Sequence, residues 1–263
     1  MLTMQKPVIP KKYRPEGFDI IHEDMDLIAV NKSSGILSVE ALWNDETVHS
    51  ALNNYIRKGA SRSSKEVYVV HRLDQYTSGV LLFAKSEKAQ QDVKSNWRDS
   101  KKTYYCVVHG RLKNREGLIE TYLSEDEDYL VHSSKTDTSG QLARTEYKVV
   151  HQAGLMSVVK INLLTGKKNQ IRVHMAELGN PIAGDIKYGE KKSTFKNLML
   201  HAYSLEIQHP FKKDRILFEA PLPAYFKNYK TDLPDTTPKT GYKVDQATGR
   251  KIENGAQTDD SGE

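Results

Sequence analysis

The segment from Val67 to Phe83 constrains the fold more than any other part of the chain. Two apolar runs, 67–70 and 80–83, enclose a polar stretch that holds Asp74 and a Thr-Ser-Gly sequence. Such runs around a polar tip predict a strand, a loop and a second strand. A lone carboxylate on a loop between two strands is a candidate nucleophile or general base, although most aspartates in such positions are turn residues.

The composition indicates a soluble globular protein with a polar surface. Of the 263 residues, 38% are hydrophobic, and the mean hydropathy is −0.63. No apolar run approaches the ~20 residues that a membrane-spanning helix needs, and the first residues hold no apolar signal-peptide core. The single cysteine, Cys106, cannot form an intramolecular disulfide and is expected to be a small buried hydrophobe. Together these features favour the cytoplasm.

The apolar periodicity predicts three helices. The first has an apolar face of Val48, Ala51, Leu52, Tyr55 and Ile56 and a cap at Asn44 or Asp45. The second has a cap at Ser86 and an apolar stripe of Ala89, Val93 and Trp97. The third runs from 169 to 178, buries Ile171, Met175 and Leu178, and stops at a Gly-Asn-Pro sequence.

The remaining pattern is dominated by strands. Hairpins are expected at 18–30 and at 145–164, and further strands at 103–108, 118–123, 129–132, 203–207 and 215–218. The fold class is therefore α+β, with a mostly antiparallel, mixed central sheet flanked by a few helices and loops. We expect a polar lead-in at 1–17, one catalytic domain at 18–230, and a disordered polar tail at 231–263.

Several motifs resemble, in order, those of the RluA-type pseudouridine synthases, and they cover residues 18 to 226. The first is His71-Arg72-Leu73-Asp74 with Thr77-Ser78-Gly79, which resembles HRLDxxTSG. The others are the hairpin ending in Asn31-Lys32, Lys102-Thr103-Tyr104, the segment Thr165 to His174, Pro181 to Asp185 with Tyr188-Gly189, and Leu198 to Ala202. One such motif is weak evidence, whereas this collinear set is highly specific.

The resemblance implies an enzyme that isomerises uridine in RNA to pseudouridine without a cofactor. The target base must be flipped into a pocket, because a duplex or folded loop hides its reacting atoms. Asp74 would be the residue that starts glycosidic cleavage, and Arg172 the arginine that pairs with it. Tyr104 matches the tyrosine that stacks on the uracil and takes the C5 proton late in the reaction, and Arg72 matches the residue that replaces the flipped base.

The basic residues predict an RNA-binding surface. The net charge is +5, and basic clusters flank the motifs, although any single cluster could be an ordinary solvated surface. The residues expected to contact RNA, besides Arg72, are Lys32, Lys102, Lys167, Lys168, Asn169, Lys191 and Lys192. Three residues depart from the family pattern: Ser33 replaces a proline, Lys167 an arginine and Asn169 a histidine. A lysine cannot fork bidentately as an arginine does.

Other side chains near the motifs receive less specific expectations. His71 is expected to pack in the core, and Asp185 to stabilise a tight turn. Strand alternation places Tyr105 on the sheet face opposite Tyr104.

Ribosomal and transfer RNA are both possible substrates, and the motifs do not choose between them. We expect no metal, because there is one cysteine and no HxxxH-type histidine pair. No protein partner is implied, so a monomer is the default expectation. The family's small N-terminal RNA-binding domain is not recognisable before the matched region.

Three alternatives compete with the enzyme hypothesis. A non-catalytic RNA-binding protein on the same fold would keep the basic surface and lose the catalytic set, which is intact here. A phosphotransferase is disfavoured, because the kinase catalytic loop places aspartate directly after arginine and needs a Gly-rich loop and an Asp-Phe-Gly sequence. A hydrolase with paired carboxylates lacks a second carboxylate in a matching loop.

Overall fold

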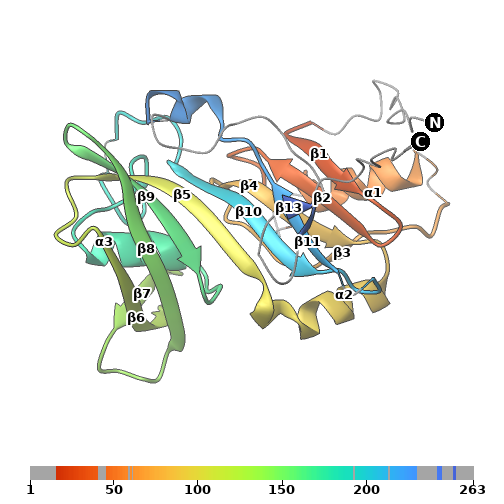
Figure 1. The fold of residues 1–263 in the computed structure, drawn as a ribbon, viewed down its shortest axis with the longest axis horizontal. Coiled ribbons are helices and arrows are strands. Elements are labelled where there is room, and N and C mark those ends of the chain that lie inside the picture. Colours follow the sequence, from red (N-terminus) through yellow and green to blue (C-terminus); the bar gives the residue numbers. More distant parts are fainter. Residues whose placement is uncertain are drawn as a thin grey trace, which may run out of the picture.

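One large sheet organises the part of the chain that the computed structural model describes (Figure 1). The described residues are 16–40, 46–58, 60, 62–191, 193–212, 214–229, 242–244 and 251–252. Within them the sheet has 13 strands, nine of which follow one another in the order β1-β2-β4-β10-β5-β9-β8-β6-β7.

The nine strands of this path are β1 (Phe18–Glu23), β2 (Leu27–Lys32), β4 (Ser78–Ala84), β10 (Leu200–Gln208), β5 (Lys101–His109), β9 (Met156–Leu163), β8 (Gln141–Ala153), β6 (Glu116–Glu125) and β7 (Val131–Ser134). Off the path, β3 (Tyr68–Val69) pairs with β4, and β11 (Arg215–Glu219) pairs with β10. These strands confirm the hairpins and single strands that the sequence predicted.

Strand β4 lies at the centre of the sheet's first half, and all seven of its residues are buried. It pairs antiparallel with β2 and parallel with β10, whereas the other strand pairs of the described residues are antiparallel. Burial on both faces explains why its sequence is a continuous apolar run rather than an alternating one. The predicted α+β class with a mostly antiparallel, mixed sheet is confirmed.

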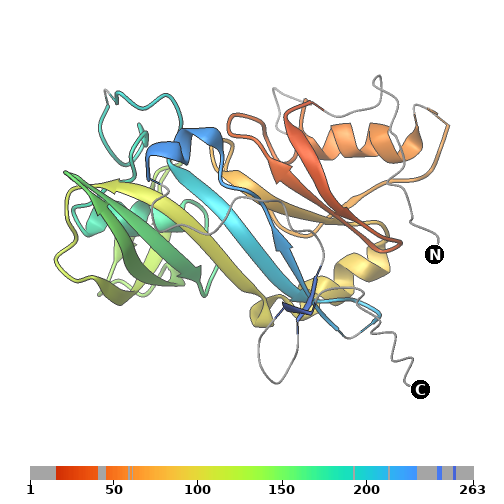
Figure 2. The ribbon, with the colours of Figure 1, turned by 45° about the horizontal axis from the view of Figure 1, so that its top comes forward.

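Helices α1 (Val48–Arg57) and α2 (Glu87–Ser95) cover opposite faces of β4. Leu81 and Phe83 share a buried cluster with residues of α1, whereas Leu82 and Ala84 share another with residues of α2. Figure 2 shows α1 above these strands and α2 below them. Successive side chains of a strand point to opposite faces of the sheet, so alternate residues of β4 pack against α1 and α2.

The helix boundaries differ from the prediction in three places. Thr47 caps α1 through a capping box with Ser50, whereas the predicted caps lie outside the described residues. Helix α2 has its predicted cap at Ser86 but ends before Trp97, which lies in a 3₁₀ turn, η2 (Trp97–Asp99). Helix α3 (Gln170–Glu177) ends before Leu178, which is exposed rather than buried.

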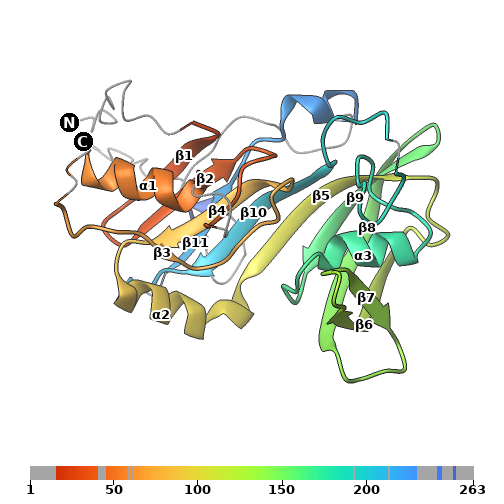
Figure 3. The same cartoon turned by 180° about the vertical axis from the view of Figure 1, so that it is seen from behind.

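Helix α3 lies beside the far half of the sheet, next to β7 and β8 (Figure 3). It has almost no amphipathic character, because Gln170, Arg172 and His174 are buried together with Ile171 and Met175. A helix enclosed on most sides must satisfy its polar side chains internally, and His174 does so by hydrogen bonds to Thr145 (2.8 Å) and Thr121 (3.0 Å).

The C-terminal segment corrects one expectation. We expected a disordered tail from residue 231, but β12 (Tyr242–Val244) pairs with β11, and β13 (Lys251–Ile252) pairs with β12. The unpaired edge of β11 explains how a polar segment can join the sheet, because backbone groups supply the hydrogen bonds. After β11, a second 3₁₀ helix, η3 (Ala224–Tyr229), buries Phe226. The rest of 231–263 and residues 1–15 of the lead-in lie outside the described residues.

Candidate active site

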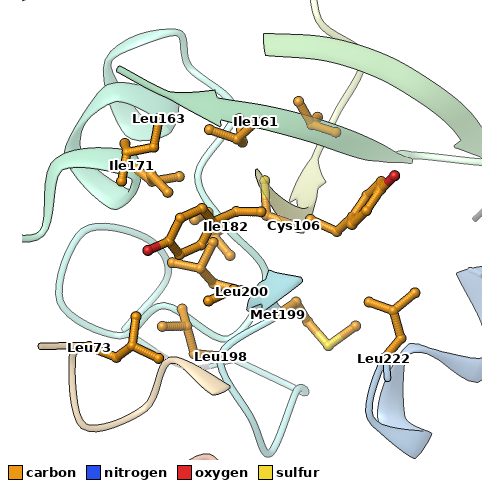
Figure 4. Close-up of a cluster of buried hydrophobic side chains, with 14 of the residues drawn as sticks. Leu73, Cys106, Ile161, Leu163, Ile171, Ile182, Leu198, Met199, Leu200 and Leu222 are labelled. Carbon is orange, nitrogen blue, oxygen red and sulfur yellow. The ribbon is translucent and has the colours of Figure 1, made fainter. Parts of the chain in front are cut away.

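Asp74 begins a tight turn between β3 and β4. The backbone N–H of Thr77 donates to the carbonyl of Asp74 (3.1 Å), and the preceding Leu73 is buried in the core. Figure 4 shows Leu73 in that cluster together with Leu198. The Ser38 hydroxyl bonds to both the N–H and the carbonyl of Leu73 (3.1 and 2.8 Å), so the chain is anchored directly before the carboxylate.

Lys32 stabilises this turn from inside the protein. It has no exposed surface, and its Nζ donates to the carbonyls of Ser33 (3.0 Å), Ile36 (2.8 Å) and Gln75 (2.7 Å). Burial lowers its pKa to about 7, against the opposing effect of the Asp74 charge. The prediction that Lys32 contacts RNA is therefore wrong: three carbonyls use its donors and enclose it.

Arg172 lies between two carboxylates. Its Nη1 donates to Asp74 Oδ2 (3.3 Å), while Nε and Nη2 donate to the two oxygens of Asp185 (2.8 Å each). The predicted contact between Arg172 and Asp74 is present, but the bidentate partner is Asp185. That aspartate also accepts backbone N–H groups of Lys187 and Tyr188, so it serves the tight turn expected of it as well.

The charges of this group are mutually dependent. Burial opposes the charge of Arg172, yet the hydrogen bonds and charge of Asp185, with a contribution from Asp74, raise its pKa. Burial would raise the pKa of Asp185, but the Arg172 guanidinium and two backbone N–H groups hold it below its ordinary value. The exposed fraction of the side chains falls from 30% for Asp74 to 9% for Arg172 and 1% for Asp185.

Asn169 orients the same arginine. It sits in the left-handed region (φ 54°) at the start of α3, and its Oδ1 accepts from Arg172 Nη1 (3.1 Å). Its Nδ2 donates to the Tyr188 hydroxyl (2.9 Å), and the Tyr188 ring lies 5.1 Å from the Arg172 guanidinium. The prediction that Asn169 contacts RNA is wrong, because the side chain is buried and both ends of its amide are occupied.

Tyr104 lies in β5 and is buried. Burial and the negative charge of Asp74 raise the pKa of Tyr104, so its phenol stays protonated at neutral pH. The neighbouring residue, Tyr105, packs edge-on against Tyr203, with the ring centroids 5.2 Å apart.

His71 is half-buried and packs against the ring of Trp97 beside the core. Its Nε2 accepts from the backbone N–H of Leu82 (3.1 Å), and its ring lies 5.0 Å from that of Trp97. Burial, and secondarily the charge of Lys102, lower the pKa of His71 to about 3. Because Nε2 accepts a hydrogen bond, the imidazole is neutral.

The other predicted RNA contacts differ in their surroundings. Arg72, Lys168 and Lys191 are exposed, and Lys167 is half-buried. Lys168 pairs with Glu125, and its Nζ lies 5.4 Å from the Tyr129 ring centroid. Lys102 donates to Ser100 (2.9 Å) beside Trp97, and burial lowers its pKa. Lys192 lies outside the described residues.

A buried polar network that sequence reasoning missed holds the start of β4. His201 Nε2 bonds to the Ala220 carbonyl (3.2 Å), so its Nδ1 accepts from the Ser78 hydroxyl (2.9 Å), which in turn accepts from the Tyr225 hydroxyl (2.8 Å). Burial lowers the pKa of His201 to about 4. The motif containing His201 was recognised, but nothing in its spacing showed that it meets Ser78.

Among the described residues, one group has spacing that suits a metal ion. It comprises Asp24, Asp26 and His209, and Asp24 already bonds both His209 (3.1 Å) and His22 (3.2 Å). The group lies at the end of β10 that is distant from Ser78, so it is separate from Asp74.

No helix in the described part of the chain is both long and apolar enough to cross a membrane.

Comparison with known proteins identifies the family. A model described as RNA pseudouridylate synthase matches residues 26–177, more than half of the chain. This chain belongs to that family. The pseudouridine synthase is 36% identical over 198 residues to the dual-specificity RNA pseudouridine synthase RluA of Yersinia pestis, covering 73% of this chain and 92% of that protein.

Two further relatives extend the comparison. The ribosomal large subunit pseudouridine synthase D of Borreliella burgdorferi is 33% identical over 225 residues, covering 81% of this chain and 69% of that protein. The structure of human RNA pseudouridylate synthase domain containing 4 has the same fold, with a TM-score of 0.67 at 22% identity, covering 81% and 92% of the two chains. The predicted resemblance is confirmed, and the protein is an isomerase that forms pseudouridine in RNA rather than a binding protein alone.

Proposed function

We propose that this pseudouridine synthase acts through Asp74 as the group that starts cleavage of the uridine glycosidic bond. The strongest support is that Asp74 is partly exposed, whereas Arg172, which pairs with it, and Asp185 behind the arginine are buried. The buried arginine is held by the buried carboxylate behind it, so its remaining donor is directed at a carboxylate that a ligand can reach. An ion pair in this arrangement restrains the rotamer of Asp74 and leaves part of the carboxylate open to the substrate.

The reaction requires no net gain or loss of atoms. The N1–C1′ bond breaks, the uracil rotates, a C5–C1′ bond forms, and the C5 proton leaves as a proton returns to N1. Asp74 can serve as nucleophile or base in the first step, and the geometry is compatible with both. No step calls for an oxidant, a reductant or a cofactor.

Tyr104 is proposed as the ring that packs against the flipped uracil. Its buried position and the effect of the Asp74 charge on its pKa support this assignment. The family resemblance gives Tyr104 a second role, as acceptor of the C5 proton. The raised pKa disfavours a phenolate base, so the phenol could take the C5 proton only if its own proton left in the same step.

We propose that RNA binds across a surface that includes the exposed Arg72 and Lys191 and the half-buried Lys167. Arg72 is proposed to occupy the space that the flipped base leaves. The names of the relatives support ribosomal RNA and, through the dual-specificity enzyme, a second RNA class, so we propose ribosomal or transfer RNA as the substrate. We also propose a cytoplasmic monomer without a protein partner.

Tritium release from 5-tritiated uridine tests this proposal, because the C5 hydrogen leaves when the new bond forms. Transcribed transfer RNA and large-subunit ribosomal RNA would be incubated with the wild type, Asp74→Ala and Asp74→Asn. We expect release by the wild type and a loss of at least about 100-fold in both variants. Asp128→Asn, which changes an exposed carboxylate on the β6–β7 turn, is the matched control and should behave as the wild type.

Circular dichroism and thermal melting would show that each variant is folded. Release by folded Asp74→Ala at the wild-type rate would contradict the role of Asp74. The RNA that loses tritium would identify the substrate class.

A further inference from the structure

A large exposed aromatic side chain lies two residues after Asp74. Tyr76 is 51% exposed, whereas the flanking Thr77 and Ser78 are buried. The function described above assigns no role to this ring. Within the described residues, its hydroxyl has no hydrogen-bond partner and its ring packs against no other aromatic ring or cation.

The backbone that carries Tyr76 is firmly held. The Ser34 hydroxyl donates to the Tyr76 carbonyl (2.8 Å), and the Gly35 N–H and Lys32 Nζ both donate to the Gln75 carbonyl (2.9 and 2.7 Å). The Gln75 amide donates back to the Gly35 carbonyl (3.0 Å). The ring is therefore presented to solvent by an ordered turn, and its exposure does not come from a loose loop.

The turn geometry places Tyr76 within reach of any RNA bound at Asp74. The two residues belong to one four-residue turn, whose first and last Cα atoms lie less than about 7 Å apart. A uridine flipped toward Asp74 leaves the base next to it with one unstacked face. An aromatic ring can stack on that unstacked face, and it can do so with any base because every base has a π-face.

We propose that Tyr76 is an RNA-contacting residue whose ring stacks on an unpaired base adjacent to the target uridine. This inference rests on the proposed function and narrows its substrate class to uridines in unpaired segments. The ring contributes to binding, and the bond-making steps remain with the Asp74 site. Arg72 and Tyr76, both exposed, then flank Asp74 in sequence and contact the RNA on either side of the flipped nucleotide.

Steady-state tritium release from the two transcribed RNAs provides the first test. We expect Tyr76→Ala to raise KM by about 5- to 100-fold with a smaller change in kcat, and Tyr76→Phe to remain near the wild type. Phe211→Ala is the matched control, because Phe211 is an exposed ring (45%) on the β10–β11 turn, at the other end of β10. An unchanged KM in Tyr76→Ala, or equal losses in the Phe and Ala variants, would overturn the proposal.

A binding measurement separates this proposal from the catalytic one. Tyr76→Trp, combined with Asp74→Asn, would be titrated with a ten-nucleotide oligouridylate and with an RNA duplex while tryptophan fluorescence is recorded. We expect quenching beyond that of the Asp74→Asn single variant with the oligouridylate and none with the duplex. Equal quenching by both RNAs, or no excess quenching, would overturn stacking on an unpaired base even if the wild type releases tritium. If the double variant shows excess quenching but the wild type releases no tritium, the proposed catalysis is contradicted and the stacking proposal stands.

Discussion

At the residue scale, one arginine connects the proposed catalytic carboxylate, Asp74, to the protein interior. Arg172 uses three of its donor nitrogens on Asp74 and Asp185, and Asn169 accepts from one of them. The fork of a guanidinium allows this, whereas a lysine ammonium would lose the paired geometry. Asp185 is therefore a positioning residue for Asp74 that acts through Arg172.

Removing the charge of Asp185 should be costly. Asp185→Asn leaves a buried guanidinium with a weakened partner, and we expect a loss of about 3 kcal/mol in the free energy of unfolding, measured by urea denaturation. Glu116→Gln, which alters an exposed pair with Lys148, should change stability by less than about 1 kcal/mol. Equal effects of the two substitutions would contradict the structural role of the buried pair.

The neutral state of His201 predicts a pH dependence. Its pKa is lowered to about 4 in the folded protein from about 6.5 in the unfolded chain, so the unfolded state binds more protons between these values. Stability should rise with pH across this window and be lost as pH falls from 6.5 to 4, by about 3 kcal/mol for this group. Protonating Nδ1 would also reverse the Ser78 hydroxyl bond.

Urea unfolding at pH 6.5, 5.5 and 4.5 measures this effect. His201→Gln should show a shallower decline with falling pH than the wild type. His132→Gln, at an exposed position on β7, should follow the wild type. An identical decline in the wild type and His201→Gln would show that His201 does not contribute to the pH dependence of the free energy of unfolding.

At the element scale, the site depends on the register of β4 against β10. Ser78 lies opposite His201 and Gly79 opposite Ala202 in this parallel pair, directly after the Asp74 turn. Gly79 has φ 113°, and a Cβ there would lie 2.1 Å from the Ala202 carbonyl oxygen. A glycine is needed both for this backbone conformation and for the close approach of the strands.

Gly79→Ala should therefore separate β4 from β10 directly after the end of the Asp74 turn. We expect a loss of several kcal/mol in the free energy of unfolding, about 3 or more, together with a fall in tritium release. Gly166→Ala is the control, because a Cβ there meets no atom and its φ is ordinary. A wild-type melting temperature for Gly79→Ala would contradict the register.

At the scale of the whole molecule, separate segments of the chain contribute the exposed cations of the proposed RNA surface. Arg72 comes from the β3–β4 turn and Lys191 from the segment after α3, and both are exposed. Each phosphate contact that a cation makes releases counterions, so binding should weaken as salt rises.

Reversing these charges tests the proposed RNA surface. Arg72→Glu and Lys191→Glu should weaken binding of transcribed RNA and reduce the salt slope by about one per lost phosphate contact, with little change in thermal stability. Lys88→Glu, on α2 beside Phe211, should leave both quantities unchanged. Fluorescence anisotropy from 50 to 300 mM salt measures them, and unchanged affinity at low salt would exclude the altered residue from the surface.

The helix and loop residues show where sequence reasoning reached its limit. Polar side chains such as Lys32 and Asn169 were predicted to contact RNA, because they lie in motifs that resemble those of the family. Whether such a side chain faces inward depends on which carbonyls or guanidinium groups meet it, and those come from other parts of the chain. Likewise, apolar spacing placed Trp97 in α2, but the helix ends at Ser95, with Asn96 as its C-cap.

Local periodicity and collinear motifs, which are properties of neighbouring residues, were enough to predict the strand pattern, the class of fold and the family. The motifs also gave Asp74, Tyr104 and Arg172 as candidate site residues. That Asp185 holds Arg172, that His201 bonds to Ser78 and that Tyr76 faces solvent became known from the folded chain. Asp74 and Arg172 are 98 residues apart, and contacts over such separations depend on sheet register and burial, which no local pattern specifies.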